Sequence, residues 1–173
     1  MVAPRACFRW LGIAVSAAAL SAGLPAQVAP GGAFPALAGA GLDGGPLPAT
    51  EGKVVLVDFW ASWCAPCKAS FPAYSRLQSA YADRGLVVVA VSVDEDASAC
   101  AAFVARLRPS FATVRDPGHR LVGAVRVPTM PTSYLVDRSG KVRFVHAGFH
   151  GEQTMRELRA EIEALLGEGQ AGP

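Results

Sequence analysis

The sequence predicts an α/β fold in which helices flank a mixed central sheet. Apolar, β-branched runs of strand length alternate with segments of helical spacing along the middle of the chain. A hairpin pattern and an amphipathic segment then close it. A Cys-x-x-Cys pair, Cys64 and Cys67, lies where the first apolar run gives way to a helical segment. At 173 residues the chain has the length of one domain.

The N-terminal residues 1–26 have the layout of a secretory signal peptide. Arg5 and Arg9 precede a short apolar stretch, Leu11–Leu20, and small residues follow. A basic start, a short apolar middle and a small-residue exit are typical of such signals. The alternative is an uncleaved membrane anchor, although the stretch is short for a span. We therefore expect an exported protein of the periplasm or cell envelope, either free or anchored at its N-terminus.

The rest of the chain divides into three predicted parts. Residues 27–33 are predicted to be a flexible linker, 34–166 the folded domain and 167–173 a disordered tail. The domain opens with two short strand-like segments, Phe34–Leu37 and Leu42–Leu47, which lie among glycines and prolines. This pattern predicts an N-terminal hairpin.

Two buried strands and a helix follow. Val54–Phe59 reads as a central strand, and Pro66–Asp83 as a helix that Pro72 should kink. Gly85 is a suitable helix stop. Leu86–Val93 is almost purely apolar, as expected for a strand that is covered on both faces.

The second half of the domain contains further helices and a hairpin. Ala97–Leu107 has helical spacing, and Arg120–Val125 predicts a short helix or turn. Ser133–Asp137 and Val142–Phe149 flank a turn sequence and predict a hairpin. Glu152–Leu166 predicts an amphipathic helix that packs its apolar side on the sheet.

Composition excludes several functional classes. Arg5 and Arg9 are two of the 16 basic residues, so the 14 that remain balance the 14 acidic residues. A chain without net charge does not show the excess of basic residues that is typical of nucleic-acid-binding proteins. Four cysteines are too few for a domain of this size to be stabilised mainly by disulfides. In an exported chain, one closely spaced pair therefore favours catalysis.

The spacing of Cys64 and Cys67 places both sulfurs on the first turn of a helix. Unpaired N–H groups at a helix N-terminus favour a thiolate, which is the species that attacks disulfides. Cys64 would attack, and Cys67 would resolve the mixed disulfide. The alternatives are a structural bridge or a zinc half-site, but no second ligand pair has zinc spacing.

Two carboxylates are candidate catalytic residues. Asp58 ends the first buried strand, so burial should raise its pKa and let it accept a proton from Cys67. Glu95 follows the second strand at the same sheet edge and would face the dithiol. The alternatives are a water-facing Asp58 and a solvated acidic loop that caps the next helix. Cys100, on an apolar helix side, is predicted to be an inert core residue.

The segment Val57–Lys68 resembles the thioredoxin active site, and Met130–Asp137 resembles its proline loop. With the export signal, the predicted hairpin and an extra segment at Val93–Arg126, the chain is similar to the TlpA/ResA/DsbE-like extracytoplasmic thioredoxins from Phe34 to Leu166. The resemblance implies a thioredoxin fold with an N-terminal hairpin and a central insertion.

The family also implies roles for individual residues. Pro131 would follow a cis peptide bond and, with Met130, Trp63 and Pro66, would dock an extended client chain. Glu95 matches a family glutamate that faces the dithiol. Asp58 matches ordinary thioredoxin at its position.

The implied activity is reduction of disulfides in exported proteins, such as apocytochrome c or copper-site assembly factors. The redox-active Cys64–Cys67 disulfide would serve without a cofactor or metal. Electrons would come from a membrane thiol transporter of the DsbD or CcdA type. We expect a monomer with no nucleic-acid partner.

Two other functions remain as alternatives. A peroxiredoxin shares the fold but has threonine where this chain has Ala61. A thioredoxin-fold copper chaperone would hold Cu(I) through Cys64 and Cys67, since soft thiolates suit that ion. It would also need a nearby histidine, for which His119 and His146 are the candidates.

Overall fold

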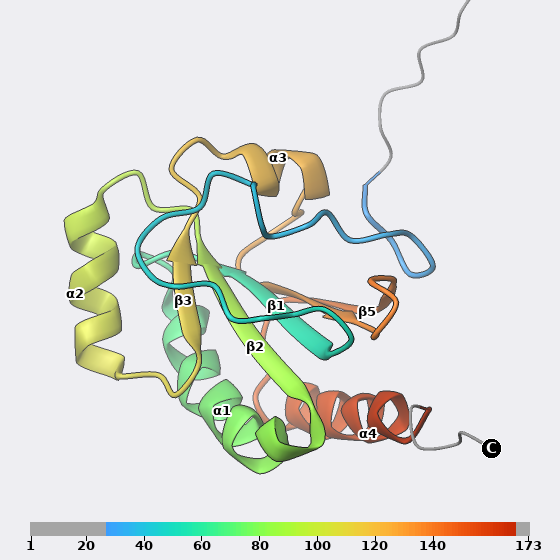
Figure 1. Ribbon diagram of the computed structural model, residues 1–173. Coiled ribbons are helices and arrows are strands. Elements are labelled where there is room, and N and C mark those ends of the chain that lie inside the picture. Colours follow the sequence, from blue (N-terminus) through green and yellow to red (C-terminus); the bar gives the residue numbers. More distant parts are fainter. Residues whose placement is uncertain (1–26, 169–173) are drawn as a thin grey trace, which may run out of the picture.

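The computed structural model describes residues 27–168, so the signal peptide predicted for 1–26 lies outside the described residues, as do residues 169–173 of the predicted tail (Figure 1). From β1 onward the elements follow the predicted order, with one additional strand. They are β1 (Val54–Trp60), α1 (Ala65–Tyr81), a 3-10 turn (Ala82–Arg84), β2 (Leu86–Ser92), α2 (Ala97–Leu107), β3 (Ala112–Arg115), α3 (Arg120–Val125), β4 (Thr132–Val136), β5 (Val142–Ala147) and α4 (Glu152–Glu168).

The strands form one mixed sheet in the order β3-β2-β1-β4-β5. β1, β2 and β3 are parallel, whereas β4 runs antiparallel to both β1 and β5. The predicted thioredoxin-like architecture is therefore confirmed. Because the parallel strands end at one edge of the sheet, the segments that follow β1 and β2 meet there. Those segments carry the dithiol and the acidic residues.

Two apolar clusters cover the two faces of the sheet. Side chains alternate along a strand, so Leu56 and Trp60 of β1 face α1, α2 and α4, while Val57 and Phe59 face the other side. That other side is covered by α3 and the N-terminal segment, which lies in front of the sheet in Figure 1. Each strand of the centre is consequently buried on both faces.

The predicted N-terminal hairpin is wrong. Ala33 forms a single bridge with Lys141, next to β5, and Asp43 forms one with Arg115 of β3. The segment therefore crosses the sheet from one edge to the other and does not fold back on itself. A lone two-stranded hairpin is marginal in water, whereas crossing the sheet packs Leu37 into the apolar cluster on that face.

Residues 27–33, predicted to be a linker, are hydrogen-bonded to the fold. The Val28 N–H donates to the Val125 carbonyl (3.2 Å), and Gly31 and Gly32 exchange backbone bonds with Val142 (2.8 Å each). At the other end, α4 continues two residues past the predicted boundary, to Glu168. The packed domain is accordingly longer than 34–166 at both ends.

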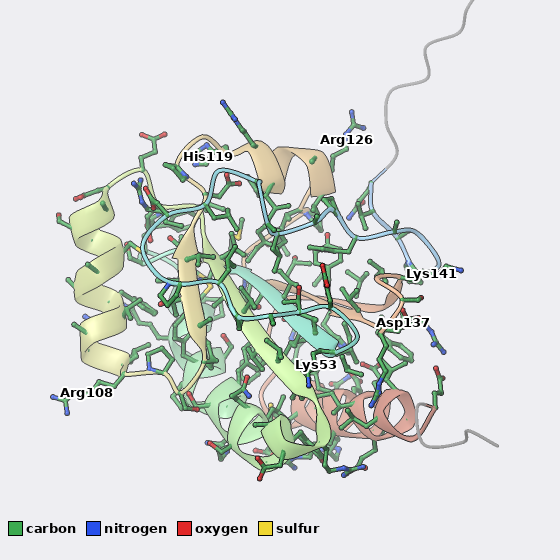
Figure 2. All side chains as sticks on the ribbon, viewed as in Figure 1. Lys53, Arg108, His119, Arg126, Asp137 and Lys141 are labelled. Carbon is green, nitrogen blue, oxygen red and sulfur yellow. A yellow bond between two sulfur atoms is a disulfide. The ribbon has the colours of Figure 1, made fainter. Side chains whose placement is uncertain are left out.

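The predicted insertion Val93–Arg126 contains α2, the short edge strand β3 and α3. Sequence reasoning missed β3, because four residues at a sheet edge give too short a pattern. Pro72 lies inside α1 without ending the helix. Charged side chains such as Arg108, Arg126 and Lys141 project from the periphery of this framework (Figure 2).

Candidate active site

The dithiol occupies the N-terminus of α1. Cys64 is the N-cap residue, and the Cys67 N–H donates to the Cys64 sulfur at 3.3 Å. The two sulfurs are disulfide-bonded. Cys64 is 4% exposed and Cys67 is fully buried, so Cys64 is the more accessible of the two. The hydrogen bond and the helix N-terminus both favour a thiolate on Cys64 once the disulfide is reduced.

Asp58 is fully buried behind the dithiol, on the sheet face that α1 covers. The Ser133 hydroxyl, on the neighbouring strand β4, donates to Asp58 Oδ1 at 2.8 Å. The second oxygen, Oδ2, is buried and has no hydrogen-bond partner among the described residues. Burial raises the pKa of this carboxyl to about 8, against the lowering effect of the Ser133 hydrogen bond. The predicted burial and the direction of its pKa shift are therefore correct.

A tyrosine extends this arrangement into the core. Tyr74 Oη lies 2.8 Å from Ser133 Oγ, and Ser133 gives its single hydrogen to Asp58, so Tyr74 is the donor in this pair. Tyr74 lies seven residues after Cys67, on the same face of α1. The chain Tyr74–Ser133–Asp58 is thus buried on the dithiol side of the sheet.

The proline loop closes another side of the site. The Met130–Pro131 peptide bond is cis, as predicted. Pro131 is buried, and its carbonyl accepts a hydrogen bond from the Gly148 N–H at 2.8 Å. Within residues 27–168, the main-chain groups of Met130 have no hydrogen-bond partner. They are therefore free to bond an extended chain, as the docking prediction requires.

The two tryptophans near the dithiol, Trp60 and Trp63, differ in exposure. Trp60 is fully buried, with its ring centroid 4.8 Å from that of Phe71 and 4.6 Å from that of Phe103. Trp63 is 70% exposed and is the one large apolar side chain of the described residues that faces solvent. Trp63 and Pro66 are therefore both accessible from solvent, as the predicted docking role needs.

The three consecutive acidic residues after β2 have separate environments. Asp94 is 4% exposed, and it accepts bonds from the Ser62 N–H (2.9 Å), the Ser62 hydroxyl (2.9 Å) and the Ser92 hydroxyl (2.7 Å). Asp96 caps α2 by accepting from the Ser98 N–H at 2.8 Å. Glu95 is exposed, and its carboxylate makes no hydrogen bond or ion pair with a described residue.

Sequence reasoning singled out Glu95 and missed Asp94, which is the acidic residue bonded to the active-site loop. Ser62 lies two residues before Cys64, so its bonds to Asp94 fix the chain that leads to the Cys64 sulfur. The available signal was the position of Asp94 directly behind the buried strand β2. Nothing in one sequence shows, however, which of three adjacent carboxylates turns inward.

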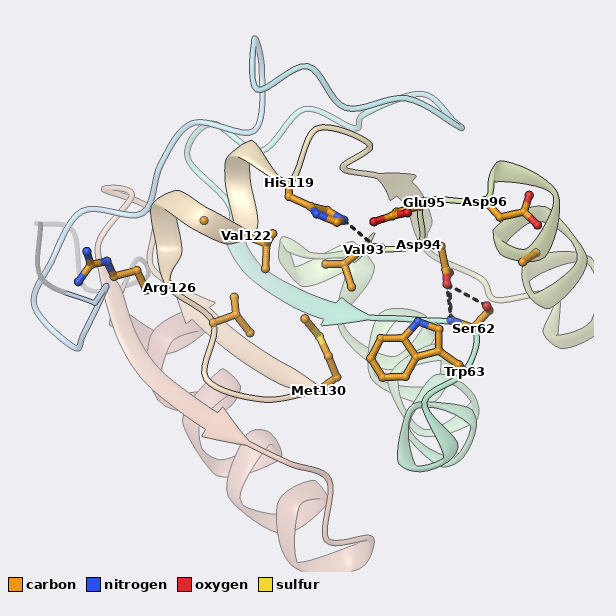
Figure 3. Close-up of a pocket in the computed structure, with 13 residues that line it drawn as sticks. Ser62, Trp63, Val93, Asp94, Glu95, Asp96, His119, Val122, Arg126 and Met130 are labelled. Atoms are coloured by element: carbon orange, nitrogen blue, oxygen red, sulfur yellow. Dashed lines mark hydrogen bonds between the residues drawn. The ribbon is translucent and has the colours of Figure 1, made fainter.

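An open groove of about 770 Å³ lies between the end of β2, α3 and the proline loop. Figure 3 shows Trp63 and Met130 at one side of it and Val122 of α3 at the other. Glu95 also lines this groove, next to the buried Asp94. The structure therefore brings the predicted docking residues Trp63 and Met130 together with Glu95 in one surface.

The remaining candidates lie elsewhere. The predicted burial of Cys100 on α2 is correct, and desolvation raises the pKa of its thiol. His119 Nε2 donates to the Val93 carbonyl at 3.0 Å, and His146 Nε2 lies 2.7 Å from a Glu161 oxygen. Among the described residues, no three His, Cys, Asp or Glu side chains form a group that could hold a metal ion.

No helix in residues 27–168 is both long and apolar enough to cross a bilayer.

Known proteins are similar to this chain in sequence and in fold. The sequence profile of the AhpC/TSA family matches residues 30–145. The thiol-disulfide oxidoreductase ResA of Bacillus cereus is 32% identical over 115 residues, which are 66% of this chain and 65% of the relative. ResA of Halalkalibacterium halodurans is 33% identical over 113 residues, 65% of this chain and 64% of the relative. The chain thus spans less than two thirds of the length of these curated relatives.

A solved structure agrees with the sequence relatives. A protein from Chlorobium tepidum, assigned as the thiol:disulfide interchange protein DsbE, superposes with a TM-score of 0.71 at 34% identity. The match covers 81% of this chain and 99% of the other.

Proposed function

The chain belongs to the AhpC/TSA family as a TlpA/ResA/DsbE-like protein, and from this premise we propose that it is an exported thiol–disulfide oxidoreductase that reduces client disulfides. One observation supports this proposal more strongly than any other. The Cys64–Cys67 pair lies at the N-terminus of α1, with a backbone N–H donating to the Cys64 sulfur. This geometry stabilises the attacking thiolate and keeps the resolving cysteine within reach.

The reaction balances in two exchanges. The Cys64 thiolate attacks one sulfur of a client disulfide, which forms a mixed disulfide and releases the first client thiolate. The Cys67 thiolate then attacks the Cys64 sulfur and releases the second client thiol. The dithiol loses two electrons, the client disulfide gains them, and the protein is left with its Cys64–Cys67 disulfide.

Asp58 is proposed to take the proton from Cys67 before the second exchange. Its free oxygen, Oδ2, and its place on the sheet face that carries Cys67 support this role. A carboxyl with a pKa of about 8 is also a stronger base than an ordinary aspartate.

The test is dithiothreitol-dependent insulin reduction by the purified protein. The parent should be active, and Cys64→Ser should abolish turnover because it removes the attacking sulfur. Cys67→Ser should accumulate mixed disulfides, which non-reducing electrophoresis detects. Cys100→Ser is the matched control, since its thiol is buried on α2, and it should keep turnover. Normal turnover by Cys64→Ser would refute the activity.

Export, the electron donor and the clients form the finer part of the proposal. The signal-like residues 1–26 support export, and in an oxidising compartment a dithiol stays reduced only if electrons are supplied. We assign the supply to a membrane thiol transporter of the DsbD or CcdA type. The clients would be cysteine pairs of apocytochrome c or of copper-site assembly factors.

Trapping in cells tests these partners. Cys67→Ser should recover the transporter and one such client as disulfide-linked species, and the parent should be found reduced. If the parent is oxidised and only unfolded, newly exported chains are trapped, the protein is an oxidase. No observation favours a copper chaperone, because His119 and His146 are bonded to other groups. The disulfide-bonded pair likewise favours dithiol chemistry over a peroxidase.

A further inference from the structure

The groove beside the dithiol has an apolar middle. Trp63, Val93, Val122, Val127 and Met130 line it, and each of these side chains is partly or largely exposed. Exposed apolar surface next to a reactive site marks a binding surface. Because the groove adjoins Trp63, the neighbour of Cys64 in the chain, a polypeptide whose cysteine reaches Cys64 can run along it. A client segment is therefore the natural occupant of this groove.

One end of the groove is acidic. Glu95 and Asp96 are exposed there, and hydrogen bonds from Ser98 lower the pKa of Asp96, so that it stays ionised. Arg115 does not neutralise Glu95. Its guanidinium donates to the Glu95 carbonyl at 3.0 Å, but its charge is paired with the Asp43 carboxylate at 2.6 Å. Arg115 thus fixes the backbone of this end and leaves the Glu95 carboxylate available.

The other end of the groove is basic. Arg126 caps the C-terminus of α3 in a left-handed conformation and is exposed, without an ion pair to any residue of 27–168. Figure 3 shows Arg126 and Glu95 on opposite sides of Val122 and Met130. His119, which faces Glu95 in that view, donates from Nε2 to the Val93 carbonyl. The groove is therefore apolar along its middle, negative at one end and positive at the other.

We propose that this groove selects clients by charge: it accepts an extended client segment with an apolar residue near the reacting cysteine and a basic residue on the Glu95 and Asp96 side. A basic residue on the opposite side of the cysteine meets Arg126 and is disfavoured. Glu95 is then a client-binding residue. This inference rests on the proposed disulfide exchange and adds to it the class of segment that is reduced.

The probes are short peptides with one cysteine, linked by a disulfide to thionitrobenzoate. Cys64 attacks the peptide sulfur and releases thionitrobenzoate, which is followed by absorbance; Cys67 then frees the peptide thiol. The two electrons come from the reduced protein. Lysine or glutamate is placed at each position on either side of the cysteine. On one side only, lysine should react about three- to tenfold faster than glutamate, as for partly exposed charge pairs.

The variants separate charge from packing. Glu95→Gln should reduce the lysine-to-glutamate ratio on the favoured side towards one. Arg126→Gln should reduce the opposite preference on the other side. Glu51→Gln is the matched control, because Glu51 is exposed at the far end of the sheet, before β1, and should keep both ratios. High salt should shrink the ratios in the parent protein, since it screens exposed charges.

The outcomes distinguish a failure of the activity from a failure of the selectivity. If the reduced protein reacts with no peptide faster than free dithiothreitol does, the proposed activity itself fails. If it reacts with every peptide at the same enhanced rate, the activity stands and charge selection is overturned. An equal fall for all peptides in Glu95→Gln would also overturn it, because that result places Glu95 at the dithiol and not at the client.

Discussion

The buried side of the dithiol and its open side each carry a carboxylate, and the two carboxylates differ in their surroundings. Behind the disulfide, Asp58 is fully enclosed, bonded to Ser133 and raised in pKa to about 8. In front, Glu95 is exposed and unpaired among the described residues. Desolvation makes a carboxylate a base, whereas exposure leaves it a charge that a partner can recognise. Position in the fold, more than residue type, separates the proposed proton acceptor from the proposed client-binding residue.

The largest effect should come from Asp58→Asn. If Asp58 takes the proton of Cys67, resolution of the mixed disulfide should slow on the order of 10²-fold, and its formation should slow less. Rapid-quench analysis of the mixed disulfide measures both steps. Equal slowing of both steps, or no slowing, would remove Asp58 from the mechanism. Glu95→Gln is the comparison on the open side and should not separate the two steps.

The same substitution should change how stability depends on pH. In the unfolded chain Asp58 ionises near its ordinary pKa of 3.8, but in the fold it ionises only near pH 8. The parent therefore loses unfolding free energy as pH rises from about 4 to about 8, and the loss is complete above that range. Asp58→Asn lacks this loss. Urea unfolding of the oxidised proteins should show that the unfolding free energy of the variant rises relative to that of the parent across this interval. If the two unfolding free energies change with pH in parallel, the raised pKa of Asp58 is refuted.

A smaller effect is expected from Ser133→Ala. It removes the donor to Asp58 Oδ1, and a hydrogen bond to a charged group contributes about 1.5–3 kcal/mol, or roughly one to two pKa units. The pKa of Asp58 should rise, so the resolution rate should need a higher pH to reach its maximum. Tyr74→Phe keeps the Ser133 donor and should move the profile less, in the same direction. A downward move in Ser133→Ala would contradict the hydrogen-bond assignment.

The smallest effect is expected from Asp94→Asn, which is compared with the same substitution at the neighbouring Asp96. Ser62 and Ser92 donate to both carboxylate oxygens of Asp94, and Asp94→Asn has one acceptor oxygen in place of two, so it cannot accept all of these bonds. We expect a loss of about 1–3 kcal/mol in unfolding free energy, together with slower protein reduction, because the loop before Cys64 loosens. For the unfolding free energy, Asp96→Asn is the matched control, since asparagine caps a helix as well as aspartate. Equal losses in the two variants would show that the Asp94 bonds do not hold the loop.

Local pattern was enough for much of this molecule. The Cys64–Cys67 spacing and the apolar strands can be recognised within a few consecutive residues, whereas the cis bond before Pro131 is implied by the resemblance to thioredoxins; the structure agrees with each. The prediction failed where the outcome depended on distant partners. The segment after Ala33 carries turn residues that suit a hairpin, but its bridges go to opposite edges of the sheet.

The sequence by itself determined the fold class, the dithiol and the burial of Asp58, because strand periodicity and Cys-x-x-Cys spacing are local properties of the chain. Tertiary structure alone decided the partners. It paired Asp58 with Ser133 and Tyr74, turned Asp94 inward and Glu95 outward, and set Arg126 across the groove from Glu95. The residues in these pairings lie tens of positions apart in the sequence. The packed sheet brings them within hydrogen-bond distance or into one groove, and no local sequence pattern shows which residues will meet.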